Sequence, residues 1–298
     1  MWPESKAAAP ASSATANVNY KQPIPSQFEE PSLPSDVIVL EKYDELEKEN
    51  KLRAERISEI VRDVSDIKPL SDDELRRIGK YWTCANDSVT ILSKFNLDVT
   101  ARDLKTLRNG KWLNDTVIDF YLSLLTDRCM KKGSKLPKSF AFTTHFFSTL
   151  KAKGHAGVAR WAKRKKVDVT KMDYVFVPMN IQNAHWALAV INNKERRFQY
   201  YDSMRGLSSM DALNRLCDYM TDESKRLGVT GIDYTEYEMD ADVPAPRQEN
   251  GYDCGVFTCT NVEYLSRGAK LTFKQSDMQN LRNKMALEVL QGELLQNE

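Results

Sequence analysis

Cys254 stands between a glycine-containing turn and an apolar run, in the stretch Gln-Glu-Asn-Gly-Tyr-Asp-Cys-Gly at residues 248–255. Val256 and Phe257 continue the apolar run, so we expect Cys254 to begin a helix. At a helix N-terminus the unpaired backbone N–H groups and the positive end of the dipole favour a thiolate over a thiol. This setting predicts that Cys254 is a nucleophile.

Three other side chains supply the remaining parts of a hydrolytic site. His185 can take the thiol proton as a base, and Asp202 can fix the tautomer of that histidine. Gln248, six residues before the cysteine, carries a neutral N–H donor for an oxyanion. These residue types predict the amide-hydrolysing chemistry of a cysteine protease, which needs neither a metal nor an organic cofactor.

The expected strands explain how His185 and Asp202 can meet. Residues 187–191 and 197–201 have the apolar pattern of short buried strands, and the Asn-Asn pair at 192–193 is typical of a hairpin turn. His185 then falls at the start of one strand and Asp202 just after the end of the next. In an antiparallel pair these two ends are neighbours, so hydrogen-bond contact is expected.

Four sequence blocks, in this order, resemble the signature blocks of the Ulp/SENP family of SUMO-specific proteases. They are residues 111–115 (Lys-Trp-Leu-Asn-Asp), 183–188 (Asn-Ala-His-Trp-Ala-Leu), 201–203 (Tyr-Asp-Ser) and 248–255. The resemblance runs from about Thr90 to the C-terminus, and four ordered blocks with a full catalytic set are very specific. It implies an α+β papain-like domain with a central mixed or antiparallel sheet flanked by helices, preceded by an N-terminal helical extension.

The same resemblance implies the substrate and the residues that hold it. The family cleaves after a Gly-Gly terminus, matures SUMO precursors and removes SUMO from lysines, so SUMO and SUMO-conjugated proteins are the expected partners. Trp112 and Trp186 are expected to clamp the C-terminal tail of the modifier in a slot that passes only glycine. Asp115 is expected on the modifier-facing surface, and Asn180 and Gln182 along the same channel.

The remaining histidines and cysteines have structural interpretations. His145 lies among phenylalanines, which indicates a packed histidine, and His155 lies between two glycines, which indicates a flexible loop. Cys259 follows Cys254 on the same expected helix and is interpreted as a core residue. The other cysteines are also interpreted as structural: Cys84, Cys129 and Cys217.

The chain divides into three predicted parts. Residues 1–36 are rich in Ala, Ser and Pro and are predicted to be disordered. Residues 37–70 are predicted to form a charged helical extension, either a partner-binding coiled coil or, more simply, a solvated helix; the absence of sustained heptads favours the second. Residues 71–298 are predicted to be the catalytic domain.

Composition narrows the class of protein. A net charge of +1 over 298 residues argues against a dedicated nucleic-acid binder. No apolar run approaches the roughly 20 residues of a membrane span. Five scattered cysteines, with no secretory signal pattern, indicate a reducing intracellular compartment, and the family resemblance implies the nucleus or nuclear envelope. We expect a monomeric catalytic domain without a zinc site.

Two other functions remain open on the sequence. A protease for another ubiquitin-like modifier, such as the Nedd type, would use the same catalytic set. A modifier-binding scaffold with vestigial catalytic residues is the alternative outside enzymology, and the complete set argues against it. The basic run at 163–166 (Lys-Arg-Lys-Lys) is interpreted as a solvated or modifier-contacting face rather than an import signal.

Overall fold

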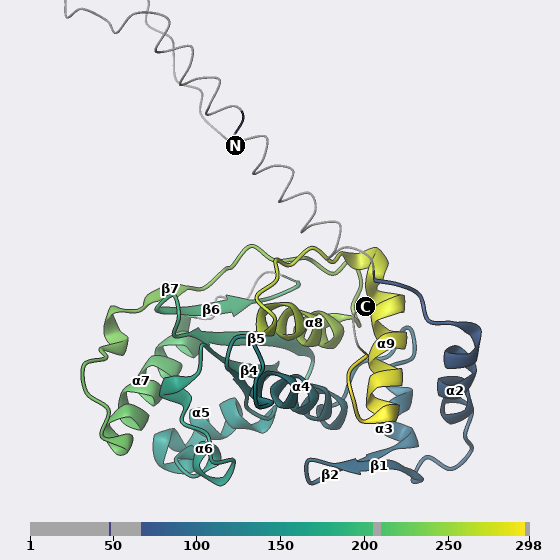
Figure 1. Ribbon diagram of the computed structural model, residues 1–298, viewed down its shortest axis with the longest axis horizontal. Coiled ribbons are helices and arrows are strands. Elements are labelled where there is room, and N and C mark those ends of the chain that lie inside the picture. Colours follow the sequence, from purple (N-terminus) through teal and green to yellow (C-terminus); the bar gives the residue numbers. More distant parts are fainter. Residues whose placement is uncertain (1–47, 49–66, 205–209, 296–298) are drawn as a thin grey trace, which may run out of the picture. The chain divides into compact units, whose positions relative to one another are not determined.

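The computed structural model describes residues 48, 67–204 and 210–295 (Figure 1). By its contacts the chain divides into Met1–Glu55 and Arg56–Glu298, and the fold below belongs to the second unit. The predicted disordered segment and most of the predicted charged extension lie outside the described residues. Within the described ranges, no helix combines the length and apolarity needed to cross a bilayer.

A mixed five-stranded sheet forms the centre of the unit, with strand order β3-β4-β5-β6-β7. The middle strands β4, β5 and β6 are antiparallel neighbours, whereas β3 and β7 add to the edges in parallel. This arrangement confirms the expected α+β class with a mixed sheet. The strands are β3 (Ser139–Ala141), β4 (Tyr174–Ile181), β5 (His185–Asn192), β6 (Arg197–Tyr201) and β7 (Glu238–Asp240).

Helices cover both faces of this sheet, so its strands are apolar on both sides. Phe176 of β4 packs in one core cluster with α4, α8 and α9, and its neighbour Val177 packs in a second cluster with α5, α6 and α7 (Figure 1). Successive side chains of a strand point to opposite faces, which explains this division. The near-continuous apolar runs of β4 and β5 follow from burial on both sides.

Besides the central sheet, the described residues form helices, a two-stranded hairpin and three short 3₁₀ turns. The helices are α2 (Asp72–Trp82), α3 (Ala101–Lys105), α4 (Asp115–Met130), α5 (His145–Val158), α6 (Trp161–Arg164), α7 (Met210–Leu227), α8 (Cys254–Ser266) and α9 (Met278–Gln291). The hairpin is β1 (Thr90–Lys94) with β2 (Leu97–Thr100), and the turns are η1 (Val169–Lys171), η2 (Tyr234–Glu236) and η3 (Gln275–Asp277).

Helix starts follow the polar caps that the sequence indicates. Ser71 and Thr100 each form a capping box at the start of α2 and α3. Asn114 caps α4 by accepting from the Val117 N–H at 3.1 Å, and its amide donates to Asp103 at 2.7 Å. The cap therefore also fixes the segment just before α4, which carries Trp112.

One segment departs from its sequence pattern. The pattern of residues 234–239 indicates a strand, but residues 234–236 form η2 and only Glu238 begins β7. The Asp233 carboxylate accepts from the Thr235 N–H at 2.9 Å, and such a local side-chain bond favours a turn over an extended strand. Tyr234 still packs inward, which accounts for the apolar signal.

Candidate active site

Cys254 is the first residue of α8 and is almost completely buried, with 2% of its surface exposed. The first turn of α8 lies against the segments that carry the two tryptophans. A Cβ on Gly255 would lie 2.9 Å from the Leu113 Cβ and 3.3 Å from the Trp186 Cδ1. Only glycine allows this approach, which explains why a glycine follows the cysteine.

The sheet brings His185 and Asp202 together as the strand prediction requires. Leu188 of β5 pairs with Tyr201 of the antiparallel strand β6, so the start of β5 and the end of β6 lie at the same end of the sheet. The His185 Nε2 lies 2.7 Å from the Asp202 Oδ1, and both side chains are largely shielded from solvent. The Met204 N–H donates to the same carboxylate oxygen at 2.9 Å, which fixes its orientation.

The Cys254 thiol lies close to the His185 ring. Nδ1 is buried and forms no hydrogen bond of good geometry within the described residues, although the Cys254 thiol is close enough to influence the ring. Burial acts to lower the pKa of His185, but the Asp202 hydrogen bond and the thiol outweigh it and raise that pKa from 6.5 to about 9. The ring therefore favours its protonated form at neutral pH, as a thiolate–imidazolium pair requires.

Gln248 is held by a residue whose role the sequence did not predict. The Ser203 hydroxyl donates to the Gln248 Oε1 at 2.7 Å, and the Gln248 backbone N–H donates to the Ser203 carbonyl at 3.1 Å. The Gln248 amide nitrogen donates to the Asn250 carbonyl at 2.5 Å. Ser203 thereby fixes which end of the amide is the donor. The sequence signal that could have indicated this role is the place of Ser203 directly after Asp202.

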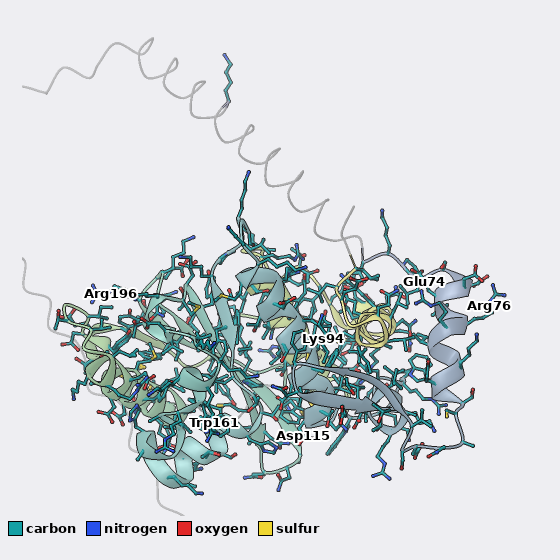
Figure 2. All side chains as sticks on the ribbon, turned by 60° about the horizontal axis from the view of Figure 1, so that its bottom comes forward. Glu74, Arg76, Lys94, Asp115, Trp161 and Arg196 are labelled. Carbon is teal, nitrogen blue, oxygen red and sulfur yellow. The ribbon has the colours of Figure 1, made fainter. Side chains whose placement is uncertain are left out.

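A groove of about 570 Å³ runs to His185 and contains all five predicted substrate-contacting residues. Its lining includes Trp112, Asp115, Asn180, Gln182 and Trp186. Asp115, at the N-terminus of α4, is partly exposed at the rim (Figure 2). These five residues thus come from α4, from the segment before it and from the ends of β4 and β5.

The tryptophans differ in exposure but are both anchored. Trp112 is 51% exposed, and its ring nitrogen donates to the Gly251 carbonyl at 2.8 Å. Trp186 is buried, and its ring nitrogen donates to the Leu113 carbonyl at 3.0 Å. These bonds therefore fix one exposed ring and one buried ring near the first turn of α8.

The interpretations of the other histidines are wrong. His145 is the first residue of α5 and is mostly exposed, with its Nε2 3.3 Å from the Asp115 carboxylate. His155 lies within α5, where the chain kinks at Gly154 with a φ of 62°, and its Nε2 lies 2.8 Å from the buried Glu223 carboxylate. Flanking phenylalanines and glycines therefore mark a helix start and a kink, rather than a core site and a loop.

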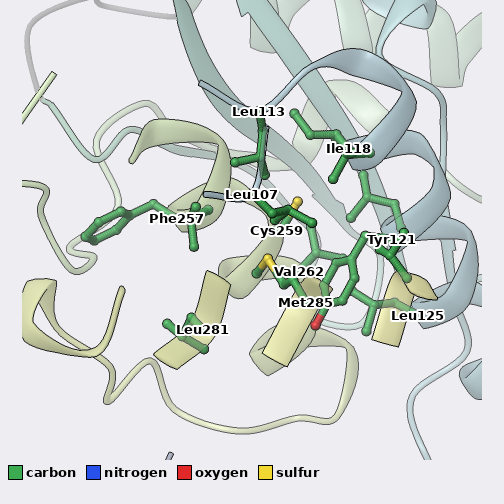
Figure 3. Packing of buried hydrophobic residues seen from close by; sticks show 14 of the residues in the cluster. Leu107, Leu113, Ile118, Tyr121, Leu125, Phe257, Cys259, Val262, Leu281 and Met285 are labelled. Atoms are coloured by element: carbon green, nitrogen blue, oxygen red, sulfur yellow. The ribbon is translucent and has the colours of Figure 1, made fainter. Parts of the chain in front are cut away.

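The second cysteine of α8 lies in the core, as predicted. Cys259 is fully buried in the cluster that contains Tyr121, Val262 and Met285 (Figure 3). Burial raises the pKa of the Cys259 thiol well above its usual range. The environment of Cys259 therefore opposes thiolate formation. Among the described residues there is also no group of three His, Cys, Asp or Glu side chains that could hold a metal ion.

Known proteins with this sequence pattern and fold are proteases. The family model described as the Ulp1 protease family, C-terminal catalytic domain, matches residues 111–293. The chain is 35% identical over 232 residues to a sentrin-specific protease of Caenorhabditis elegans, covering 78% of this chain and 33% of that protein. It is 33% identical over 230 residues to ubiquitin-like-specific protease 1 of Saccharomyces cerevisiae, covering 76% and 34%. The chain thus spans about a third of the length of these two relatives.

Solved structures agree with the sequence relatives. The C-terminal Ulp1 protease domain in complex with Smt3, the yeast ortholog of SUMO, superimposes with a TM-score of 0.68 at 32% identity, over 76% of this chain and 98% of that one. A second structure, the SUMO protease Ulp1 with its catalytic cysteine oxidised to a sulfonic acid, gives a TM-score of 0.67 at 31% identity, over 76% and 97%. The chain belongs to the Ulp1 protease family and contains that family's C-terminal catalytic domain.

Proposed function

We propose that this protein is a SUMO-specific cysteine protease that cleaves after the C-terminal Gly-Gly of SUMO, both in precursors and in lysine conjugates. The observation that carries the proposal is the position of Cys254 at the N-terminus of α8, beside a His185 ring whose other nitrogen is bound to Asp202. The structural likeness to a protease domain solved with a SUMO ortholog supports the choice of modifier.

The proposed reaction begins with proton transfer from Cys254 to the Nδ1 of His185. Asp202 stabilises the resulting imidazolium through the 2.7 Å bond to Nε2. The thiolate attacks the carbonyl of the last glycine, and His185 then gives its proton to the departing amine, which is a lysine side chain or the α-amine of a propeptide. Water hydrolyses the thioester, and no metal or cofactor takes part.

The negative charge of the tetrahedral intermediate requires two donors. We assign them to the Gln248 side-chain amide and the Cys254 backbone N–H. A primary amide has two N–H donors, and in Gln248 one of them binds the Asn250 carbonyl. Because the Ser203 hydroxyl binds the Gln248 amide oxygen, the amide is held in one orientation, with its nitrogen available as the donor to the oxyanion.

The proposed basis of glycine selectivity is steric. Trp112 and Trp186 are both tied to backbone carbonyls, so the slot between them cannot widen without breaking a hydrogen bond. A residue with a Cβ would have to push one ring aside, whereas glycine would not. Asp115, Asn180 and Gln182 line the same groove and are proposed to contact the modifier and its tail.

We also propose the bounds of the catalytic domain, its oligomeric state and the location of the protein. We assign the catalytic domain to residues 71–298 and expect it to act as a monomer. Five free thiols, including the nucleophile, suit a reducing compartment, and we place the protein inside the cell, in the nucleus or at its envelope. Microscopy of the tagged protein tests that location.

A panel of ubiquitin-like proteins with C-terminal electrophiles tests the proposed function. SUMO probes should label the wild type, Cys254→Ser should not be labelled, and Cys259→Ser should behave as the wild type because that thiol lies in the core. Labelling by a Nedd-type probe alone would support the protease for another modifier. A folded wild type that no probe labels would be the inert scaffold.

The raised pKa of His185 predicts the alkaline limit of activity. The ring keeps its proton up to about pH 9 and loses it above, so cleavage of a SUMO precursor should fall as the pH rises through that value. Asp202→Asn should move this limit to lower pH and reduce turnover by up to about 10⁴-fold, as for other triads that lose their carboxylate. The exposed Asp242→Asn is the matched control, and equal profiles for the two variants would contradict the assignment.

The bond between Ser203 and Gln248 predicts graded effects on turnover. Gln248→Ala should lower kcat by about 10²–10³-fold, the range for losing one oxyanion donor. Ser203→Ala should lower kcat by about 5-fold, because one orienting hydrogen bond is worth about 1 kcal/mol. The double variant should match Gln248→Ala alone, since both changes act on one amide. Additive losses would separate Ser203 from the oxyanion site.

The tryptophan slot predicts the cost of a side chain in the substrate tail. The wild type should cleave Gly-Gly precursors far faster than Gly-Ala precursors, and Trp186→Ala should narrow this ratio while lowering turnover by about 10²-fold through lost alignment. Trp112→Ala should have a smaller effect because that ring is half exposed. Trp161→Ala, on α6, is the control. A wild-type ratio near one would place selectivity elsewhere.

A further inference from the structure

Arg282 of α9 is the largest fully buried side chain described, with no exposed surface. The Arg282 Nε donates a hydrogen bond to one carboxylate oxygen of Asp253 at 2.8 Å, and Nη2 lies 2.7 Å from the same oxygen as an ion pair. The remaining donors bind backbone carbonyls, namely those of Thr106 (3.3 Å), Arg108 (3.0 Å), Lys111 (2.8 Å) and Tyr252 (3.0 Å). Such a fork of donors is available only to arginine.

These partners belong to two segments that the proposed reaction uses. The carbonyls at 106, 108 and 111 lie in the connection between α3 and α4, which leads directly into Trp112. Tyr252 and Asp253 immediately precede Cys254. One buried cation therefore ties the wall of the substrate groove to the loop that presents the nucleophile. The bond from Trp112 to the Gly251 carbonyl joins the same two segments from the other side.

The Asp253 carboxylate is also turned away from the helix that it precedes. An aspartate at this N-cap position commonly accepts from the N–H groups of the first turn. Here its side chain makes no such bond to α8. One oxygen binds Arg282, and the other accepts from the Asn250 amide at 2.7 Å and the Gln275 amide at 2.8 Å. The carboxylate thus leaves the first-turn donors beside Cys254 to the sulfur and the oxyanion.

We propose that Arg282 is a positioning residue for the proposed protease reaction, on which this inference rests. It holds the Asp253 carboxylate off the N-terminus of α8, neutralises that charge beside the Cys254 thiol, and fixes the Trp112 segment against the nucleophile loop. Without it, a carboxylate adjacent to the sulfur would oppose thiolate formation and compete for the same N–H donors. Among the described residues, His185 on β5 also interacts with Cys254, and its ring is bound in turn to Asp202 after β6.

The test measures alkylation of Cys254 by iodoacetamide as a function of pH in the full chain, with the modified site read by peptide mass spectrometry. Arg282→Gln leaves the carboxylate unpaired, so the midpoint of the curve should move up by about one pH unit. Asp253→Asn leaves the cation unpaired, so the midpoint should move down. Arg282→Lys keeps the charge but not the fork, so its midpoint should stay near wild type while kcat for precursor cleavage falls by about 10-fold or more.

Shifts of the alkylation midpoint in opposite directions in Arg282→Gln and Asp253→Asn distinguish positioning from loss of stability. Loss of stability would move both midpoints in the same direction or leave both unchanged. Arg128→Gln is the matched control, because Arg128 pairs with Glu263 at the far end of α8 at 3.0 Å and its loss should leave the midpoint unchanged. If Arg282→Gln does not fold, Asp253→Asn and Arg282→Lys still decide: an unmoved or raised midpoint in the first, or wild-type kinetics in the second, overturns the proposal. A wild type with ordinary thiol reactivity would instead contradict the proposed function.

Discussion

The approach of α8 to β5 is the constraint on which the site depends. Every residue of α8 except Leu265 is buried, so the helix is fixed on all sides by α4, α9 and the sheet. A Cβ on residue 255 would lie 2.9 Å from the Leu113 Cβ, closer than real Cβ atoms approach, so only glycine lets the first turn of α8 pack here. Because Trp186 follows His185 on β5, this one contact sets the position of Cys254 relative to both His185 and Trp186.

Burial also decides the electrostatics of the site. A charge removed from water is tolerated only when hydrogen bonds and an opposite charge replace the lost hydration. Both buried charge pairs near Cys254 meet this condition: Asp202 with His185, and Asp253 with Arg282. The first pair is coupled to the thiol and raises the His185 pKa to about 9, while the second is saturated by its own neighbours.

Local sequence signals predicted most of the fold. The bounds of β6 and α7 agree with the patterns of residues 197–201 and 210–227, because each element is apolar on its buried side and ends at clear turn residues. The same signals place His185 and Asp202 at the same end of the sheet. They failed where a local bond or a kink overrode the pattern, as at Asp233 and Gly154.

Long-range contacts could not be predicted in this way. Arg282 lies in an ordinary helical stretch, and nothing in its immediate sequence indicates that its guanidinium binds carbonyls some 170 residues earlier in the chain (176, 174 and 171 positions away). Ser203 is closer to the motifs, yet its bond to Gln248 depends on how the segment after β6 meets the segment before α8. The sequence blocks identify the groups that would react, whereas the contacts that orient them appear only in the fold.

The same steric rule operates on both sides of the proposed slot. Within the protein, the missing Cβ of Gly255 lets the first turn of α8 pack against Leu113, whose carbonyl in turn accepts from the Trp186 ring nitrogen. In the proposed reaction this ring would leave little room above Cys254, and only a tail that lacks a Cβ would fit there. Glycine in the protein and glycine in the substrate would thus answer one packing constraint. On this proposal, the selectivity of the slot and the position of the thiol would arise from a single contact rather than from two independent features.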